Sequence, residues 1–361
     1  MQMEFMKSRF LYAKARESNN KWQIGNLLTN KDTRLDKAIL DYLLLQREPF
    51  LRFDLIREIG NDAFQHLIDN RIIIPYKWDS HDLDMIEIET STVCNWKCRF
   101  CPTTSDWRYP RFMSMELFEN IVKKMADEKP SSSVAIHFYN EPTLDPLFLK
   151  RVEIVKKYGL QLSLYTNGTG LDSAKLSDLS QIGILKSLVI NIPSIDRERF
   201  QFLTAGGNYD KTVQVLETAI HMHLPVQVSV HGKNEVACLL KKMNMTKDYL
   251  ASFRTVDRAG ILQNEYCDHI YLDSPYLFGC ILIMKRMYVD IDGFCIICCQ
   301  DYYKEYRYAH ISDGPLSLIY GKKLSQLRKV VCGGEPAGKD FICRKCRIMD
   351  DMRINSLFRL L

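Results

Sequence analysis

The chain has 361 residues, of which 46% are hydrophobic, so it can bury a large core spread over two or three domains. Forty-nine Lys and Arg residues against 44 Asp and Glu residues give a net charge of only +5. This balance does not by itself indicate nucleic acid or a membrane surface as partner, and no run of about 18 apolar residues could span a bilayer.

Twelve cysteines are a high count for a chain whose first residues lack the apolar core and the cleavage site of a secretory signal. In a reducing compartment, clustered cysteines are more often metal ligands than disulfide partners. We therefore expect a cytoplasmic protein that binds metal through thiolates and has no membrane partner.

Residues 1–85 are expected to form a winged-helix-like α+β module. Apolar spacing predicts a helix from Thr33, with Thr33 and Asp36 as its capping box. Two shorter helices follow, separated by Gly60 as a C-cap, and strands are expected at 21–24 and 72–74. The module holds 13 Lys/Arg and 13 Asp/Glu residues, so it lacks the positive charge that collects phosphates and DNA binding is disfavoured.

Residues 86–265 alternate between strand and helix patterns, which is typical of parallel β/α units. Functional residues in such sheets lie at the carboxyl ends of the strands. Strands are expected at 133–139, 160–165, 187–192, 225–231 and 253–256, with helices from Ser114 and at 147–158 and 210–222.

The first strand end carries Cys94, Cys98 and Cys101 with C-x3-C-x2-C spacing. Three thiolates are one fewer than the usual four ligands of a [4Fe–4S] cluster, so one iron would keep an open position for a ligand from outside the protein. Zinc is the alternative, although it usually takes four ligands and favours paired C-x2-C spacings.

The cysteine triplet is followed by N-E-P at 140–142 and T-N-G at 166–168, each at a later strand end. In this order the motifs resemble the radical SAM superfamily over roughly residues 85 to 346. The resemblance implies an α/β fold with a partial (β/α)6 TIM-like barrel. It also implies an enzyme that uses a [4Fe–4S] cluster and S-adenosyl-L-methionine (SAM) to make a 5′-deoxyadenosyl radical, which abstracts a substrate hydrogen.

The family's second motif is usually G-G-E-P, and both glycines are replaced here. The resemblance implies that the Glu141 carboxylate and neighbouring carbonyls hold the amino group of SAM. Alternatives stay open: T-N-G is also a common turn, Ser194 and Asp196 suit a helix cap, and Arg258 suits a surface turn. The residues implied in cofactor binding are Asn140, Glu141, Pro142, Thr166, Asn167, Ser194 and Arg258.

The C-terminal cysteines suggest a second cluster. Cys280, Cys298, Cys343 and Cys346 have C-x17-C…C-x2-C spacing, and four thiolates satisfy a second, auxiliary [4Fe–4S] cluster. This pattern resembles the twitch domain, a shortened SPASM domain, and places it at 266–361. Cys299 is the main rival of Cys298, a zinc knuckle or redox pair is the alternative for the last two cysteines, and one of the remaining five could donate a hydrogen atom.

The order of elements in residues 1–85 is similar to the peptide-recognition domains of radical enzymes that act on ribosomally made peptides, where a leader peptide adds a strand. A packing module without ligand is the alternative. We therefore expect a radical SAM oxidoreductase or maturase that oxidises, cross-links or epimerises such a peptide, supplied with electrons by a flavodoxin or ferredoxin. The rival hypothesis is a dehydrogenase or epimerase of a small sugar or aminocyclitol in natural-product biosynthesis, and a DNA-binding iron–sulfur sensor is a distant third.

Overall fold

The computed structural model describes residues 4–8, 10–16, 20–45, 50–75, 83–106, 108–231, 233–242, 246, 249–252, 257–262 and 269–349. Contacts divide the chain into two compact units. Unit 1 comprises Met1–Ser80, Ile270–Lys285 and Leu324–Leu361, and unit 2 comprises His81–His269 and Arg286–Lys323. The domain limits expected from sequence, 1–85, 86–265 and 266–361, remain predictions.

Unit 2 is built on one nine-stranded sheet with the order β12-β11-β10-β9-β8-β7-β13-β14-β15. All neighbours from β12 to β13 pair in parallel, whereas β14 and β15 continue the sheet antiparallel. The strands are β7 Met85–Ile88, β8 Ser133–Ala135, β9 Gln161–Thr166, β10 Leu185–Asn191, β11 Val226–Ser229, β12 Leu250–Ser252, β13 Arg286–Val289, β14 Phe294–Ile296 and β15 Arg307–His310.

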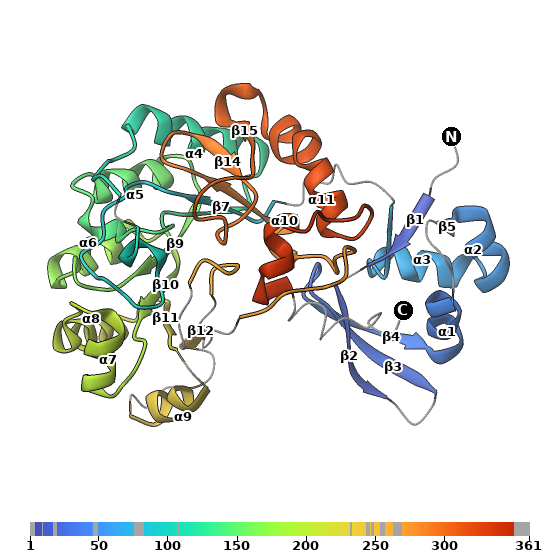
Figure 1. Cartoon of the computed structure of the whole chain (residues 1–361), viewed down its shortest axis with the longest axis horizontal. Helices are drawn as coiled ribbons and strands as arrows, with labels where there is room; N and C mark the ends of the chain where they lie inside the picture. The colour runs from blue at the N-terminus through green and yellow to red at the C-terminus, as the bar shows by residue number, and fades with distance from the viewer. Residues whose placement is uncertain are drawn as a thin grey trace. The chain divides into compact units, whose positions relative to one another are not determined.

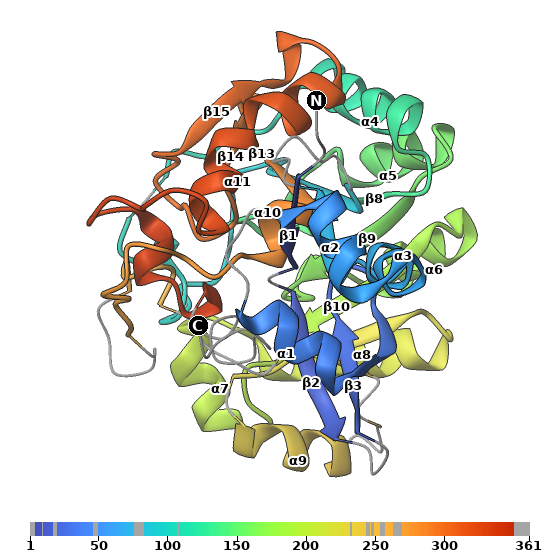
Figure 2. The same cartoon turned by 90° about the vertical axis from the view of Figure 1, so that its right-hand side faces the viewer.

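Helices follow the parallel strands and lie along one side of the sheet (Figures 1 and 2). They are α4 Met115–Glu128, α5 Phe148–Lys157, α6 Ser173–Ile182, α7 Arg197–Thr204, α8 Tyr209–His221 and α9 Lys233–Lys242. The alternation of strand and helix confirms the predicted α/β class with a partial barrel. Ser114 caps α4 as expected, since its hydroxyl accepts a hydrogen bond from the Leu117 backbone N–H.

The two faces of this sheet differ sharply in chemistry. The face toward the helices is aliphatic, and its side chains are fully buried: Ile86, Ile88, Val134, Leu162, Leu164, Leu188 and Ile190. Because successive side chains of a strand point to opposite faces, the residues between them form the other face. That face is mostly polar: one row in register across the strands is Tyr288, Glu87, Ala135, Ser163 and Ser187, and the next is Tyr165, Val189 and Gln227. We call it the inner face.

The N-terminal part of unit 1 contains two three-stranded sheets, β2-β3-β4 and β5-β1-β6, and three helices. A single apolar cluster that includes Ile24, Leu35, Leu43 and Phe64 joins them, and α2 packs beside α3 (Figure 2). The elements are β1 Glu4–Lys7, β2 Leu11–Arg16, β3 Lys21–Asn26, β4 Lys31–Asp36, α1 Lys37–Leu45, β5 Phe50–Leu51, α2 Arg52–Ile59, α3 Asn61–Asp69 and β6 Ile73–Pro75.

The predicted start of the first helix is wrong. Thr33 and Asp36 do not cap a helix, because they lie in β4 opposite Ile24 and Lys21 of β3. The helix begins only at Lys37. The expectation for Gly60 is confirmed: it ends α2 with φ 82°, a left-handed value that favours glycine, and α3 follows directly.

The later segments of unit 1 are joined by backbone hydrogen bonds. Leu272 N–H donates to Arg344 O at 2.7 Å, and Gly279 N–H donates to Val331 O at 2.9 Å. They contain α10 Ile281–Lys285 and α11 Ser325–Val331. Gly333 has φ 78°, and a Cβ there would lie 2.4 Å from the Leu277 carbonyl oxygen, so only glycine fits this crossing. Among the described residues of the whole chain, none of the helices is long and apolar enough to cross a membrane.

Candidate active site

The cysteine loop leaves the carboxyl end of β7 and is fastened to the end of α7. Lys97 N–H donates to Thr204 O at 3.1 Å, and Arg99 N–H donates to Leu203 O at 2.9 Å. Trp96 packs edge-on against Phe200 with ring centroids 5.4 Å apart. The path of the loop is therefore set by α7, a helix that follows it by about a hundred residues.

Cys94, Cys98 and Cys101 lie close enough for their charges to influence one another. Cys98 is buried, and burial followed by the charges of Cys101 and Cys94 raises the pKa of its thiol well above the usual value, whereas Cys94 is exposed. Burial of this kind disfavours a thiolate. A cationic iron cluster would offset this effect, because its positive charge lowers the pKa of the thiols that bind it. Within the described residues, no set of three His, Cys, Asp or Glu side chains has the geometry to hold a single metal ion.

Glu141 of N-E-P is almost completely buried, with 1% exposure, and both its carboxylate oxygens accept hydrogen bonds from the chain itself. Oε1 accepts from the Thr143 N–H and hydroxyl at 3.1 and 2.5 Å and from the Thr166 hydroxyl at 2.6 Å, while Oε2 accepts from Asn167 N–H at 2.6 Å. Burial raises the pKa of Glu141 although these four donors favour the carboxylate. These hydrogen bonds fasten N-E-P to T-N-G, and the expectation that the Glu141 carboxylate also binds the amino group of SAM remains a prediction.

Hydrogen bonds also tie T-N-G to the cysteine loop. Asn167 Nδ2 donates to Asn95 Oδ1 at 3.0 Å, and Asn95 Nδ2 donates to the Thr169 hydroxyl at 3.0 Å. Gly168 has φ 82°, so the segment is also the turn that its composition indicated. The three motifs, separated by up to 74 residues, thus meet at one edge of the sheet.

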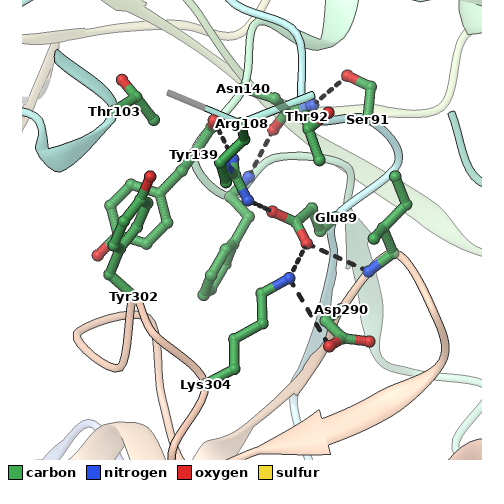
Figure 3. Close-up of polar contacts among 12 residues, drawn as sticks. Glu89, Ser91, Thr92, Thr103, Arg108, Tyr139, Asn140, Asp290, Tyr302 and Lys304 are labelled. Atoms are coloured by element: carbon green, nitrogen blue, oxygen red, sulfur yellow. Dashed lines mark hydrogen bonds and ion pairs between the residues drawn. The ribbon is translucent and has the colours of Figure 1, made fainter. Parts of the chain in front are cut away.

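The missing glycines of the second motif are explained by the backbone. Neither Tyr139 nor Asn140 has a positive φ, so glycine is not required at either position. The Asn140 side chain folds onto its own turn, where Oδ1 accepts from Phe138 N–H at 2.8 Å and Nδ2 donates to the Ser91 hydroxyl at 3.0 Å (Figure 3). Pro142 then opens a short 3-10 turn over Pro142–Leu144.

A buried ionic network supports this turn from below (Figure 3). Glu89 is fully buried and pairs with Arg108 and Lys304, and it accepts a hydrogen bond from Ile291 N–H at 3.2 Å. Arg108 also donates to the Tyr139 carbonyl at 2.7 Å. Burial alone would raise the pKa of Glu89, but the charges of Lys304 and Arg108 outweigh it and lower that pKa. Glu87 in β7 and Glu89 directly after it alternate in the sequence, and the other members of the network are distant in the chain.

Ser194 and Arg258 are placed differently from each other. The Ser194 hydroxyl is buried and donates to Glu235 Oε2 at 2.9 Å, so its hydrogen bond goes to α9, and Asp196 caps α7 as one alternative had it. Arg258 has φ 53° and its guanidinium lies 5.5 Å above the Tyr139 ring, beside N-E-P. The strand expected at 253–256 lies outside the described residues.

A second polar group, missed by the sequence reasoning, occupies the inner face. Arg286 Nη1 donates to Glu87 Oε1 at 2.7 Å, and His137 Nε2 lies 3.4 Å from Glu87 Oε2. The rings of His137 and Tyr165 have centroids 4.1 Å apart, and Tyr288 is the cross-strand partner of Glu87. We call Glu87, His137, Tyr165, Arg286 and Tyr288 the inner-face cluster.

The predicted auxiliary ligands fall into both units. Cys280, Cys343 and Cys346 belong to unit 1, where the latter two are buried at a short 3-10 turn, Ile342–Lys345. Cys298 belongs to unit 2, next to its rival Cys299, whose carbonyl accepts a hydrogen bond from the Tyr139 hydroxyl at 2.5 Å. The assignment of these four ligands therefore remains a prediction.

Comparison with known proteins agrees with this geometry. The S-adenosyl-L-methionine-dependent 2-deoxy-scyllo-inosamine dehydrogenase of Niallia circulans is 24% identical over 266 residues, which cover 73% of this chain and 92% of that enzyme. The structure of Streptococcus suis SuiB bound to precursor peptide SuiA matches with a TM-score of 0.54 and 12% identity over 96% of this chain and 94% of that one. The structure of native anSMEcpe with bound AdoMet and Kp18Cys peptide matches with a TM-score of 0.57 and 16% identity over 75% and 95%.

The family model described as the Radical SAM superfamily matches residues 88–243, which contain all three motifs. Radical SAM enzymes use a [4Fe–4S] cluster and SAM, so the predicted cofactors are confirmed, and the twelve cysteines are enough to hold a second cluster as well. Residues 88–243 of this chain therefore form a radical SAM domain.

Proposed function

We propose that this radical SAM enzyme modifies a ribosomally made peptide by oxidation, cross-linking or epimerisation. The observation that carries the proposal is the extent of its structural likeness. The likeness to SuiB, solved with a precursor peptide, extends over 96% of this chain. The alignment to the aminocyclitol dehydrogenase covers almost all of that enzyme yet leaves about a quarter of this chain unmatched.

The N-terminal module has a suitable edge for a peptide strand. In the sheet β2-β3-β4, the pairing of β2 with β3 is interrupted by a bulge between Ala13 and Ala15, whereas β4 pairs with β3 in unbroken register. A bulge blunts a sheet edge, and a regular edge accepts an added strand through main-chain hydrogen bonds. His66 of α3 lies against β4, with Nε2 at 3.1 Å from Arg34 O. The β4 edge, flanked by α3, is therefore the proposed leader-binding groove.

In unit 2, Cys94, Cys98 and Cys101 would hold the SAM-binding cluster. When bound, the cluster and SAM supply the radical that removes a hydrogen atom from the substrate. Glu141 and Asn140 hold their turn rigid, so that its backbone carbonyls present acceptors at a fixed position. Arg108 fixes the Tyr139 carbonyl through a hydrogen bond of 2.7 Å. The protein thus contributes a pre-positioned site rather than a flexible one.

Cys280, Cys298, Cys343 and Cys346 are the proposed ligands of the auxiliary cluster, which would carry electrons or organise structure. Cys298 is preferred over Cys299 because it completes the C-x17-C spacing with Cys280, and Cys299 remains its rival.

The test is anaerobic reconstitution of the full chain, followed by SAM, a reductant and a short peptide encoded beside this gene. We expect 5′-deoxyadenosine together with a change in peptide mass, or deuterium uptake from D2O if the product is an epimer. Replacing the peptide by one with a scrambled leader is the matched control. Formation of 5′-deoxyadenosine without any change in the peptide would contradict the proposal.

A dehydrogenase or epimerase of an aminocyclitol is the second candidate. It is favoured by the 24% identity over 266 residues to the Niallia circulans enzyme. It predicts turnover of amino sugars or aminocyclitols by the same reconstituted protein, without any peptide. Removal of hydrogen from such a ring, with no effect on the peptide, would replace the first proposal by this one.

A further inference from the structure

Two buried polar atoms of the inner-face cluster have no hydrogen-bond partner among the described residues. These are the Tyr288 hydroxyl, on a side chain with 0% exposure, and Nδ1 of His137. A buried polar atom that lacks a partner costs about 1–3 kcal/mol, so native proteins keep few of them. Two such atoms around one carboxylate, Glu87, indicate a place prepared for a ligand.

The carboxylate decides which nitrogen of His137 carries the proton. Glu87 already pairs with Arg286 at 2.7 Å, and it lies 3.4 Å from His137 Nε2. A carboxylate can only accept, so the proximity of Glu87 favours the tautomer with its hydrogen on Nε2, which leaves Nδ1 of the neutral ring as an acceptor. Burial, which outweighs the charge of Glu87, lowers the pKa of His137 and keeps the ring neutral.

Tyr288 offers the complementary group. It is the cross-strand neighbour of Glu87, and burial with the charge of Glu87 raises its pKa well above the usual value, so the phenol keeps its hydrogen and can donate. The cluster therefore presents one acceptor and one donor without a partner. Its two full charges, Glu87 and Arg286, form an ion pair at 2.7 Å, and the charge of Arg258 outside the cluster also acts on His137.

We propose that the inner-face cluster binds an uncharged substrate group that both donates and accepts hydrogen bonds, namely a hydroxyl or a primary amide. A carboxylate only accepts and would leave His137 Nδ1 unmatched. An ammonium only donates, would leave the Tyr288 hydrogen unmatched, and would be repelled by Arg286. The inference rests on the proposed function, since it takes the inner face as the substrate side of the enzyme.

The experiment measures binding and needs no turnover. The full chain, reconstituted anaerobically with iron, sulfide and SAM, is dialysed to equilibrium against four small probes. Two are neutral, N-acetyl-threoninamide for a peptide side chain and myo-inositol for a cyclitol ring, and two are charged, butyrate and butylammonium. We expect the neutral probes to bind more tightly than the charged ones. The neutral probe that binds more tightly shows whether the bound hydroxyl or amide belongs to a peptide side chain or to a cyclitol ring.

Two variants test the named atoms. Tyr288→Phe and His137→Phe should each weaken binding of the neutral probe by about five- to tenfold, the loss of one hydrogen bond. Tyr288→Phe should nevertheless keep or raise the melting temperature, because it removes a buried donor without a partner, and a purely structural tyrosine would lose stability. The control is Tyr158→Phe, whose hydroxyl donates to Glu119 at 3.0 Å outside the inner face, and it should not change binding.

The inference is overturned if no probe binds, if charged probes bind as well as neutral ones, or if neither variant affects neutral binding. Failure of the proposed function looks different. A protein that discriminates the probes but leaves every peptide unchanged would contradict the peptide proposal alone. A protein that modifies its peptide but binds all probes alike would contradict this inference alone.

Discussion

Replacing Glu89 by glutamine tests whether the buried ionic network holds the second motif in place. Glu89 is fully buried between Arg108 and Lys304, so the isosteric Glu89→Gln change keeps the shape, leaves Arg108 without its counter-charge and leaves Lys304 with Asp290 alone, at 3.7 Å. Breaking a buried pair in this way costs about 3 kcal/mol or more. In a unit of this size, 3 kcal/mol corresponds to a loss of about 6–12 °C in melting temperature.

The assay is scanning calorimetry of the full chain at neutral pH. Glu119→Gln is the matched control, because Glu119 pairs with Lys157 at the exposed surface, where an ion pair adds little to stability. A Glu89→Gln protein that melts together with the control would refute the role given to this network. An unchanged affinity of the Glu89→Gln protein for SAM would refute this role as well, because it would mean that Arg108 does not position the Tyr139 carbonyl.

The pH dependence has a definite sign. The pKa of Glu89 is lowered in the folded protein, so its contribution to stability is fully present above the ordinary carboxyl pKa. It is lost as the pH falls through the lowered value. The difference in melting temperature between the native chain and Glu89→Gln should therefore be constant near neutral pH and shrink in acid. A difference that grows in acid would contradict the assignment.

Three further changes have defined outcomes. Cys98→Ala should lower the iron content of the reconstituted chain by about four atoms, whereas Cys238→Ala, at an exposed position of α9, should leave it unchanged. Glu141→Gln should weaken SAM binding about tenfold with little change in fold, because an amide nitrogen cannot accept the hydrogen bonds that fasten the turns, and isothermal titration would measure this. Arg151→Met should lower the melting temperature by about 6–12 °C, since it leaves Asp145 buried and charged after the loss of a 2.7 Å ion pair, and an unchanged melting temperature would contradict this.

The barrel could be predicted because its signals are local. Period-two aliphatic strands alternate with amphipathic helices, and each motif follows a strand. The N-terminal strands could not be found in this way. Leu35 has helical spacing to the apolar residues that follow it, yet residues 31–36 form a hairpin with β3. Pairing with another strand outweighs such local preference.

The site was predicted in its motifs but not in its hydrogen bonds. The spacing of Cys94, Cys98 and Cys101 is a local signal, whereas Lys304 meets Glu89 across 215 residues and gives no sequence pattern. The role of Glu141 also depends on distant partners, because donors from two different turns take up its oxygens. Residues that hold one another across such separations can be recognised only once the sheet has brought them together.

The contrast between the two faces of the sheet bears on how this enzyme can evolve. Stability depends on one set of alternate positions, such as Ile86 and Leu164, and contact with substrate is proposed for the set between them, such as Glu87 and Tyr165. A substitution at an inner position leaves the aliphatic layer untouched. New substrates can therefore be sampled by single mutations at inner positions that carry no buried ion pair, such as Ser163 and Gln227, without loss of the scaffold. A saturation scan that measures growth and protein abundance separately should show this alternation between neighbouring residues.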